Sequence, residues 1–477
     1  MWLACEIILL LCTFASITFV TEANTIHVSM TGEDEEACGR VENPCASLSF
    51  AVGIASDYDT IYVDTGTYEL NATVEISKPL NLTTPLQSSA TLICSHNSPA
   101  LNLTSDVCLV GFSIRNCTDG AFQIAYSTAQ IRNCRILENG KFGSSAVTIQ
   151  DSNVTVSNCT FNGNYGMNGG AINAYDTANA KNSSLVIEDS SFVDNYATQR
   201  GGAIYSDISC TIVSCVFDSN IAERTGGAFF QSSGNFSVLI TGSVFRNNSV
   251  PRNSDGKLMG GAVCATNPTS TIIRESYFAN NSVNSLSSNS QLGGGAISAS
   301  SVTMNLEIYH CEFDNNTVQA AIADRGFYIG FSLAAITQAT TLRGIAISEQ
   351  EIHVLSVSFG LAGFHMAIRS EQISVVDCSF TETALYISYT TSNTQIQGLL
   401  LMMSSSDIVI QNTTFRDNSV SVLYNQGSNF LLGGLVSLLS DNITITESTF
   451  ANNDISFAYF SGSFLQLSGV LLVEVPS

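Results

Sequence analysis

A short pattern of residues recurs along this 477-residue chain, and it limits the possible folds more than any other feature. Around Phe161, Val154 and Val156 stand seven and five residues before the ring, Cys159 two before it, and Asn164 three after it. This spacing, apolar-x-apolar-x-x-[Cys/Ser/Thr]-x-Phe-x-x-Asn, returns at Phe192, Phe217, Phe245, Phe278, Phe313, Phe415 and Phe450. Self-similarity at a nearly fixed period is the signature of a repeat architecture. Three copies depart from it: Ile136 replaces the ring, and Phe359 and Phe380 lack the Asn.

A second element, Gly-Gly-Ala followed by an apolar residue, precedes most of these rings. It occurs at Gly169–Ile172, Gly201–Ile204, Gly226–Phe229, Gly260–Val263 and Gly294–Ile297, with a close variant at Gly433–Val436. Degenerate forms are assigned to Ser144–Val147, Gly344–Ile347, Gly363–Phe364 and Gly398–Leu401. Residues 317–350 otherwise lack both motifs, and we interpret them as irregular coils or a packed-over loop.

The internal spacing predicts short strands. Val154 and Val156 alternate with polar residues, so they share one face of a strand. Cys159 and Phe161 alternate in the opposite parity, so a turn or bulge must separate the two pairs if both are to face the core. Asn164 suits a sharp bend because Asn tolerates the left-handed backbone conformation, and Gly-Gly then opens a third strand.

Strands this short are stable only when successive repeats stack. The pattern therefore predicts an all-β fold, a right-handed single-stranded parallel β-helix of about twelve coils. Like side chains then form columns, and amides stacked in the interior satisfy one another's hydrogen bonds. We expect a structural row of amides at Asn139, Asn164, Asn195, Asn220, Asn248, Asn281 and Asn316, and a column of rings at Phe161, Phe192, Phe217, Phe245, Phe278 and Phe313. Extra residues fall mainly between the Asn and Gly-Gly, so we expect one loop-rich edge.

The paired motifs carry a family resemblance. Gly-Gly-Ala-[Ile/Leu/Val] interleaved with Phe-x-x-Asn resembles the repeats of polymorphic outer membrane proteins, and the chain is more broadly similar to pectin-lyase-like β-helix proteins. The resemblance covers about residues 95–475, and it implies a surface-displayed passenger, often adhesive. The segment 25–70, with Cys38, Pro44-Cys45 and Gly66-Thr67-Tyr68, resembles the first coil of secreted eukaryotic β-helix proteins.

Several features predict a secretory route. Residues 1–23 are typical of a signal peptide, with an apolar run from Ile7 to Val20 and a small-residue cleavage site at Thr21-Glu22-Ala23. An uncleaved anchor is the alternative, but the run is short for a membrane-spanning helix. Asn-x-Ser/Thr sequons are dense, which predicts N-glycosylation in a secreted chain. The candidate acceptors are Asn71, Asn81, Asn102, Asn116, Asn153, Asn182, Asn235, Asn247, Asn280, Asn315, Asn412 and Asn442, while Asn158 is also a sequon but is expected inside a strand.

The predicted organisation is a signal peptide (1–23), a capping segment with the first coils (24–94) and β-helix repeats (95–477). Ser461–Phe464 fits the Gly-Gly position and Val473 and Val475 fit the apolar positions, so the next ring would fall beyond Ser477. The repeats thus end within a coil. We hypothesise that the chain is a fragment, and one alternative is the ectodomain of a larger receptor-like protein with a membrane anchor further on.

Cysteines are expected to play structural roles. Cys38 and Cys45 lie close together in a turn-rich segment and are favoured as a local disulfide. Cys210 with Cys215, or Cys94 with Cys108, are further possible pairs. Cys117, Cys134, Cys159, Cys215, Cys311 and Cys378 are assigned to one small, inward-facing position, which Ser or Thr fills in other repeats. Single stacked thiols do not provide a metal site.

The net negative charge of the chain limits the classes of partner that it can bind. With 17 Lys and Arg against 40 Asp and Glu, the formal charge is −23, which excludes nucleic acid as a partner. Asp176 and Asp207 follow their Gly-Gly elements without other groups converging on them, so we assign no catalytic, cofactor-binding or metal-binding residue. The leading hypothesis is a secreted or cell-surface scaffold with an extracellular protein or glycan as partner. The alternative is a polysaccharide lyase or glycosidase on the same fold.

Overall fold

The computed structural model describes residues 23–474, with gaps at 86–89, 142, 178–182, 233, 235, 252–257, 286–291, 301–303, 321–327, 331, 349–350, 355–365, 388–393, 397–400, 423–428, 433–435, 458–463 and 468–470. Almost all of the predicted signal peptide therefore lies outside the described residues. Within these ranges the structure contains one helix of seven residues, α2 (Leu48–Ile54), and a long series of strands.

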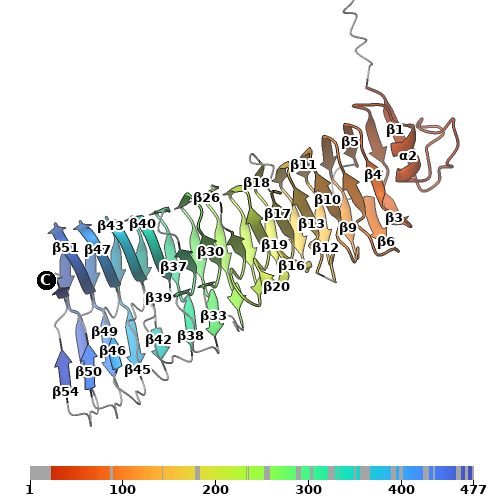
Figure 1. Ribbon diagram of the computed structural model, residues 1–477. Coiled ribbons are helices and arrows are strands. Elements are labelled where there is room, and N and C mark those ends of the chain that lie inside the picture. Colours follow the sequence, from red (N-terminus) through yellow and green to blue (C-terminus); the bar gives the residue numbers. More distant parts are fainter. Residues whose placement is uncertain are drawn as a thin grey trace, which may run out of the picture.

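The strands wind into one elongated rod, in which they follow each other in sequence order from one end to the other (Figure 1). One coil contains β13 (Val147–Gln150), β14 (Asn153–Ser157), β15 (Thr160–Asn162) and β16 (Tyr165–Asn168). The next coil repeats them as β17 (Ile172–Tyr175), β18 (Ser184–Glu188), β19 (Ser191–Val193) and β20 (Tyr196–Arg200), each pairing in parallel with its predecessor. The all-β, right-handed parallel β-helix is confirmed.

The core lies inside the coils, where the repeat motif places its apolar residues. Val154, Val156, Cys159 and Phe161 are all buried, and they come from two different strands. Asn158, between the two pairs, has a φ of 51°, and this left-handed residue reverses the parity as the sequence predicts. Asn158 is exposed in this turn rather than inside a strand, so that expectation was wrong.

The bend after the Phe strand differs from the prediction by one residue. Gly163 and Asp194 adopt the left-handed conformation there, with φ of 65° and 53°, whereas Asn164 and Asn195 do not. The Asn is therefore selected for its buried amide and not for its backbone. The residue before it adopts the left-handed turn, and that position is occupied by Gly, Asp, Ser or Asn in most coils and by Glu138 and Glu382 in two.

Two strands of every coil share one sheet. The Gly-Gly strand and the apolar-x-apolar strand both belong to a sheet of 25 described strands, here called the large sheet. In the last coils they fuse into single strands of 11 residues: β40 (Leu333–Arg343), β43 (Met366–Val376), β47 (Leu401–Gln411) and β51 (Val436–Thr446). The Phe strands form a second sheet of 14 described strands, here called the Phe sheet.

The segment expected to be a loop-rich edge contains further strands. β16, β20, β24 (Ile221–Ala222), β28 (Ser249–Val250), β33 (Ser282–Ser285) and β38 (Thr317–Ala320) form a third parallel sheet. Later coils add β42 (Glu351–Val354), β45 (Ala384–Ile387), β49 (Ser419–Val422) and β53 (Asp454–Phe457), which extend the rod on one side in Figure 1. The inserted residues pair with the same insertion one coil away, and this satisfies their backbone groups.

Two assignments in the second half of the chain are corrected. Residues 317–350 contain a regular coil, because β40 pairs with both neighbouring coils and β41 (Ala346–Ser348) joins the Phe sheet. Ile347 takes the ring position there, opposite Phe313 and Phe380, so Gly344–Ile347 is not a Gly-Gly element. Phe359, assigned to a ring position, and Gly363–Phe364 lie outside the described residues.

The final coil is also shifted. Leu471 in β55 (Leu471–Glu474) stands opposite Val436, in the position that the sequence assigned to Ser461–Phe464. Phe464 instead lies in β54 (Phe464–Leu467) and pairs with Asn429. Val473 stands opposite Leu438 in the Gly-Gly strand, so its assignment to an apolar-x-apolar position was wrong.

At the other end, Ser47 caps the N-terminus of α2, and its hydroxyl accepts a hydrogen bond from the N–H of Phe50. Leu48, Ala51 and Val52 bury one face of the helix at the end of the rod (Figure 1). Parallel pairing already begins between β1 (Thr25–Val28) and β2 (Thr60–Val63). The division of the chain at residue 94 stays a prediction.

Candidate binding face

The predicted asparagines lie in one buried row. From Asn139 to Asn316, each Nδ2 donates to the carbonyl of the residue at the ring position one coil earlier, as from Asn220 to Phe192 at 2.9 Å. From Asn164 to Asn316, each Oδ1 accepts from the backbone N–H and the Nδ2 of the preceding Asn, at 3.1 and 3.0 Å between Asn195 and Asn220. The row is interrupted at Thr383 and resumes at Asn418 and Asn453. From Cys117 to Asn316, each turn of the Phe edge is thus bonded to the next through side chains.

The rings form a parallel stack beside this row. From Phe161 to Phe313 neighbouring ring centroids are 4.6–5.2 Å apart and their planes differ by 2–11°. Phe380, Phe415 and Phe450 continue the stack in the last coils. The stacked rings fill the core at regular intervals, so the outer side chains of successive coils also lie at a regular spacing.

A second hydrogen-bonded column occupies the position two residues before the ring. Ser243 Oγ accepts from the N–H of Cys215 at 3.1 Å and donates to the carbonyl of Thr241 at 3.0 Å. Thiols act in the same way: burial raises the pKa of Cys215 to about 11 and that of Cys311 to about 12, so both stay protonated and can donate. The sequence identified this position as small and inward-facing but did not reveal its hydrogen bonds.

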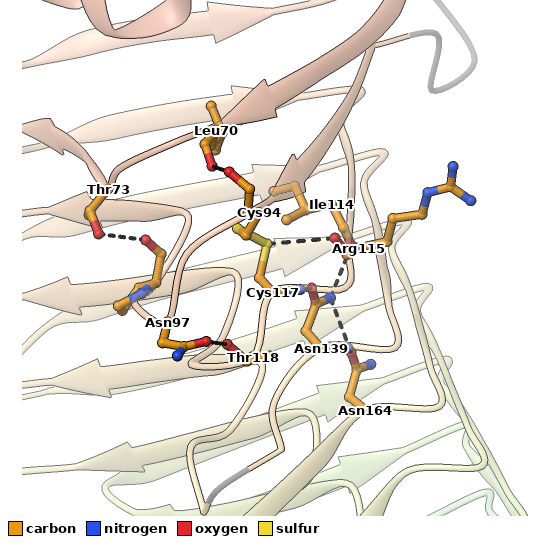
Figure 2. Close-up of a disulfide and its surroundings, with 12 residues drawn as sticks. Leu70, Thr73, Cys94, Asn97, Ile114, Arg115, Cys117, Thr118, Asn139 and Asn164 are labelled. Carbon is orange, nitrogen blue, oxygen red and sulfur yellow. Dashed lines mark hydrogen bonds between the residues drawn. A yellow bond between two sulfur atoms is a disulfide. The ribbon is translucent and has the colours of Figure 1, made fainter.

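A disulfide links Cys94 to Cys117 at the start of the Asn row (Figure 2). Cys117 holds the position of a row Asn, since its N–H donates to Asn139 Oδ1 at 3.1 Å. Its assignment to the small inward position was therefore wrong. The pairing of Cys94 with Cys108 was also wrong, because Cys108 lies on β8 (Val107–Val110) of the large sheet, away from β6 (Ala90–Cys94) in the Phe sheet.

We predict that this disulfide and the Asn row are partly interchangeable. The bond closes a separation of 23 residues, so C94S/C117S should lower the free energy of unfolding by about 3 kcal/mol. C94S/C117N should regain about 1–2 kcal/mol, because an Asn at residue 117 can extend the row toward the carbonyl of Leu92. Urea unfolding of the two double variants measures the difference. Equal stability would show that residue 117 is not equivalent to a row position.

The remaining described cysteines form one further disulfide or are free thiols. The Cys38–Cys45 disulfide is confirmed, with both residues buried in the first segment. Cys210 and Cys215 are not bonded to each other, because Cys210 faces the core from the large sheet and Cys215 lies beyond the turn. Among the described residues the free thiols are Cys108, Cys134, Cys159, Cys210, Cys215, Cys264, Cys311 and Cys378.

The sequon asparagines lie at the surface wherever they are described. Asn102 is half-buried and donates to Glu75 at 2.6 Å, whereas Asn71, Asn81, Asn116, Asn153, Asn158, Asn247, Asn280, Asn315, Asn412 and Asn442 are exposed. Asn182 and Asn235 lie outside the described residues. N-glycosylation stays a prediction.

The outer face of the large sheet carries a hollow of about 470 Å³ across the last coils, here called the large-sheet hollow. It lies where the 11-residue strands bend, since Thr337 and Thr340 both face inward with two outward residues between them. The hollow is lined by Ile336, Thr337, Arg369, Ser370, Glu371, Ser404, Ser405, Ser406, Leu439 and Asp441.

Buried hydroxyl groups stabilise this bend from the core side of the large sheet. Thr337 Oγ1 lies 2.6 Å from both Thr340 Oγ1 and Ser370 Oγ, and the last two lie 2.8 Å apart. Ser405 and Ser440 hold the equivalent place in later coils and bond to backbone carbonyls. Because the bend is fixed, exposed Arg369 and Glu371 project from a preformed floor.

This hollow was not predicted from the sequence. A Ser or Thr stands four residues after the apolar residue of the Gly-Gly position at Leu333, Met366, Leu401 and Val436, and that offset was the available signal. The Gly-Gly position itself is degenerate in these coils, so the register on which the offset depends was not evident.

Two carboxylates approach each other on the outer side of the large sheet. Asp207 is the last residue of β21 (Ile204–Asp207). The pKa of its carboxyl group is raised above the ordinary value, mainly because the group is partly buried and also because the charge of Asp176 is close. The carboxylate oxygens of Asp176 are buried and have no hydrogen-bond partner among the described residues. Beside them, Tyr175 donates to Gln150 at 3.2 Å. The sequence placed these acids but not their proximity, which depends on the coil-to-coil register.

Within the described ranges, no three His, Cys, Asp or Glu side chains cluster as a metal site would require. The same part of the chain contains no helix long and apolar enough to span a membrane.

Comparison with known proteins supports the repeat. The Chlamydia polymorphic membrane protein repeat matches residues 189–207, a short part of the chain that includes Phe192 and the Gly201–Ile204 element. No curated protein matches the chain.

Solved structures of similar fold include enzymes and an adhesin. A rhamnogalacturonan lyase is 11% identical over 64% of this chain and 86% of its own, with a TM-score of 0.40. PfbA, a surface adhesin of Streptococcus pneumoniae, is 14% identical over 83% and 85%, with a TM-score of 0.36. Pectate lyase Pel9A is 14% identical over 64% and 80%, with a TM-score of 0.33. At such identities these likenesses say nothing about the activity of this chain.

Proposed function

We propose that the protein is a secreted or cell-surface β-helix scaffold that makes adhesive contact with an extracellular protein or glycan through the outer face of the large sheet. The large-sheet hollow is the observation that carries this proposal. It is concave and lined by both apolar and polar side chains, and its floor is held by buried hydroxyls rather than by a mobile loop. The repeat match and the predicted signal peptide agree with a surface location.

The chemistry of the hollow suits a neutral or mixed polar surface. Arg369 can donate two parallel hydrogen bonds to a partner. Glu371 and Asp441 can accept hydrogen bonds from it, and the serine hydroxyls can donate or accept. A strongly acidic partner would meet the net charge of −23 as well as these two carboxylates. Arg369, Ser404 and Leu439 stand opposite one another on consecutive strands, so an extended partner could contact several coils at once.

The test is binding of the full secreted chain to immobilised extracellular-matrix proteins and to neutral and acidic polysaccharides. R369A/E371A should reduce binding at least fivefold, because it removes both signs of charge from the floor. The matched control R115A/E312A removes the same charges from exposed positions on the Phe sheet and should bind like the unmodified chain. Equal binding by both variants, or binding to nothing in the panel, would contradict the proposal.

A carbohydrate-active enzyme is the second candidate, and the Asp176 and Asp207 pair favours it. Paired carboxylates can act as acid and base on a glycosidic bond, and the raised pKa of Asp207 suits the acid. The same polysaccharide panel decides between the candidates. New reducing or unsaturated ends that disappear in D207N would establish the enzyme and displace the adhesive reading.

A further inference from the structure

We propose that Asn247, Asn280 and Asn315 form a row of N-glycans along one turn of three consecutive coils. The proposal rests on secretion, as the proposed function does, but it concerns a different edge of the rod. The three asparagines begin the segments Asn-Asn-Ser, Asn-Asn-Ser and Asn-Asn-Thr. In each, the first Asn is the acceptor and the second belongs to the buried row.

Backbone geometry presents each acceptor outward. Asn247, Asn280 and Asn315 have φ of 57°, 52° and 47°, so each occupies the left-handed turn that follows its ring. All three are exposed, while the next residues, Asn248, Asn281 and Asn316, are at most 1% exposed. The turn therefore points neighbouring asparagines in opposite directions, one to solvent and one into the core.

Register places the acceptors directly above one another. Each follows its Phe-sheet strand by one residue: β27 (Val244–Arg246), β32 (Tyr277–Ala279) and β37 (Glu312–Asp314). Arg246 pairs with Ala279, and Ala279 with Asp314. The associated rings are 5.0 and 5.2 Å apart, which is the distance from one coil to the next. Sequons 33 and 35 residues apart in sequence are thus nearest neighbours in the fold.

The existing contacts are compatible with modification. Asn247 Nδ2 donates to Asp218 Oδ1 at 2.9 Å, and Asn315 Nδ2 donates to Asn280 Oδ1 at 2.9 Å. A primary amide has two N–H hydrogens, and glycosylation replaces one of them, so the inter-coil bond can persist. In the reaction Nδ2 bonds to the sugar C1 of a lipid-pyrophosphate-linked oligosaccharide, the C1–O bond to phosphate breaks, the lipid pyrophosphate leaves, and the amide gives up one proton.

The row of adjacent acceptors is confined to these coils. At the same turn the four preceding coils carry Glu138, Gly163, Asp194 and Ser219, and none of these is an acceptor. Asn116, one coil before Glu138, is an acceptor at this turn but stands apart from the row. The turn lies between the Phe sheet and the third sheet, whereas the hollow lies on the large sheet. The glycans would therefore cover one edge and leave the proposed contact face open.

Fold requirements alone offer a competing explanation for the motif. A left-handed turn favours Asn, the row requires Asn, and Ser or Thr then opens β28, β33 or β38, so a sequon can arise without being used. Occupancy decides between the two. The full chain, with its own first 23 residues, is secreted from a eukaryotic culture, treated with an N-glycan amidase in ¹⁸O-water, and mapped by mass spectrometry.

We expect Asp labelled with ¹⁸O at residues 247, 280 and 315. T317V removes the sequon with a β-branched residue of similar shape and should lose one glycan, while T317S keeps the sequon and should keep that glycan. A secreted chain with all three asparagines unmodified would overturn the row and leave the scaffold proposal standing. Failure to be secreted would instead overturn the surface location, and a chain refolded from bacteria then distinguishes a folding defect from a missing signal.

Discussion

Replacing Asn220 with alanine should lower the free energy of unfolding by about 4 kcal/mol. Asn220 is fully buried and takes part in hydrogen bonds with both neighbouring coils. Its loss leaves the carbonyl of Phe192, and the backbone N–H and the amide of Asn195, without those partners. Each unsatisfied buried group costs about 1–3 kcal/mol.

Urea unfolding followed by circular dichroism measures this effect. The matched control is N305A, at an exposed position opening β36 (Asn305–Tyr309), which should change stability by less than about 0.5 kcal/mol. A loss of under 1 kcal/mol for N220A would show that the row is not a major source of stability.

Replacing Phe217 with alanine should cost about 3–5 kcal/mol. The ring is fully buried, and its centroid lies 4.8 and 4.6 Å from those of Phe192 and Phe245. Truncation leaves a gap in a column whose spacing is set by backbone pairing, so the neighbouring rings cannot close it.

The control for this prediction is F217L. Ile136 and Ile347 already occupy the ring position in their own coils, so an aliphatic side chain fits the column. We expect F217L to cost less than about 1.5 kcal/mol in the same denaturation experiment. A cost for F217L equal to that of F217A would mean that aromatic stacking, rather than filled volume, holds the column together.

The positions of residues could be predicted from the sequence wherever the repeat is regular. Between Phe161 and Phe313 every column was placed correctly, because each coil carries both motifs and each motif keeps its own internal spacing. Errors gathered where one motif is missing: Ile347 was assigned to the Gly-Gly position, and Cys117 to the wrong column. An error in register moves a residue to another sheet, and that is why the partner of Cys94 was misidentified.

The amino-acid pattern alone determined the class of fold, the inward-facing residues and the asparagine and phenylalanine columns, because these depend on spacing within one repeat. The tertiary structure decided which coils lie side by side and what the inserted residues do. In the fold, Asp176 lies beside Asp207, and the segments expected to be loops form further sheets. The last long strands bend to form a hollow, and three sequons that are distant in sequence lie on adjacent coils. All of these depend on contacts between coils, whose varying lengths leave the pairing of outer residues open until the backbone hydrogen bonds fix it.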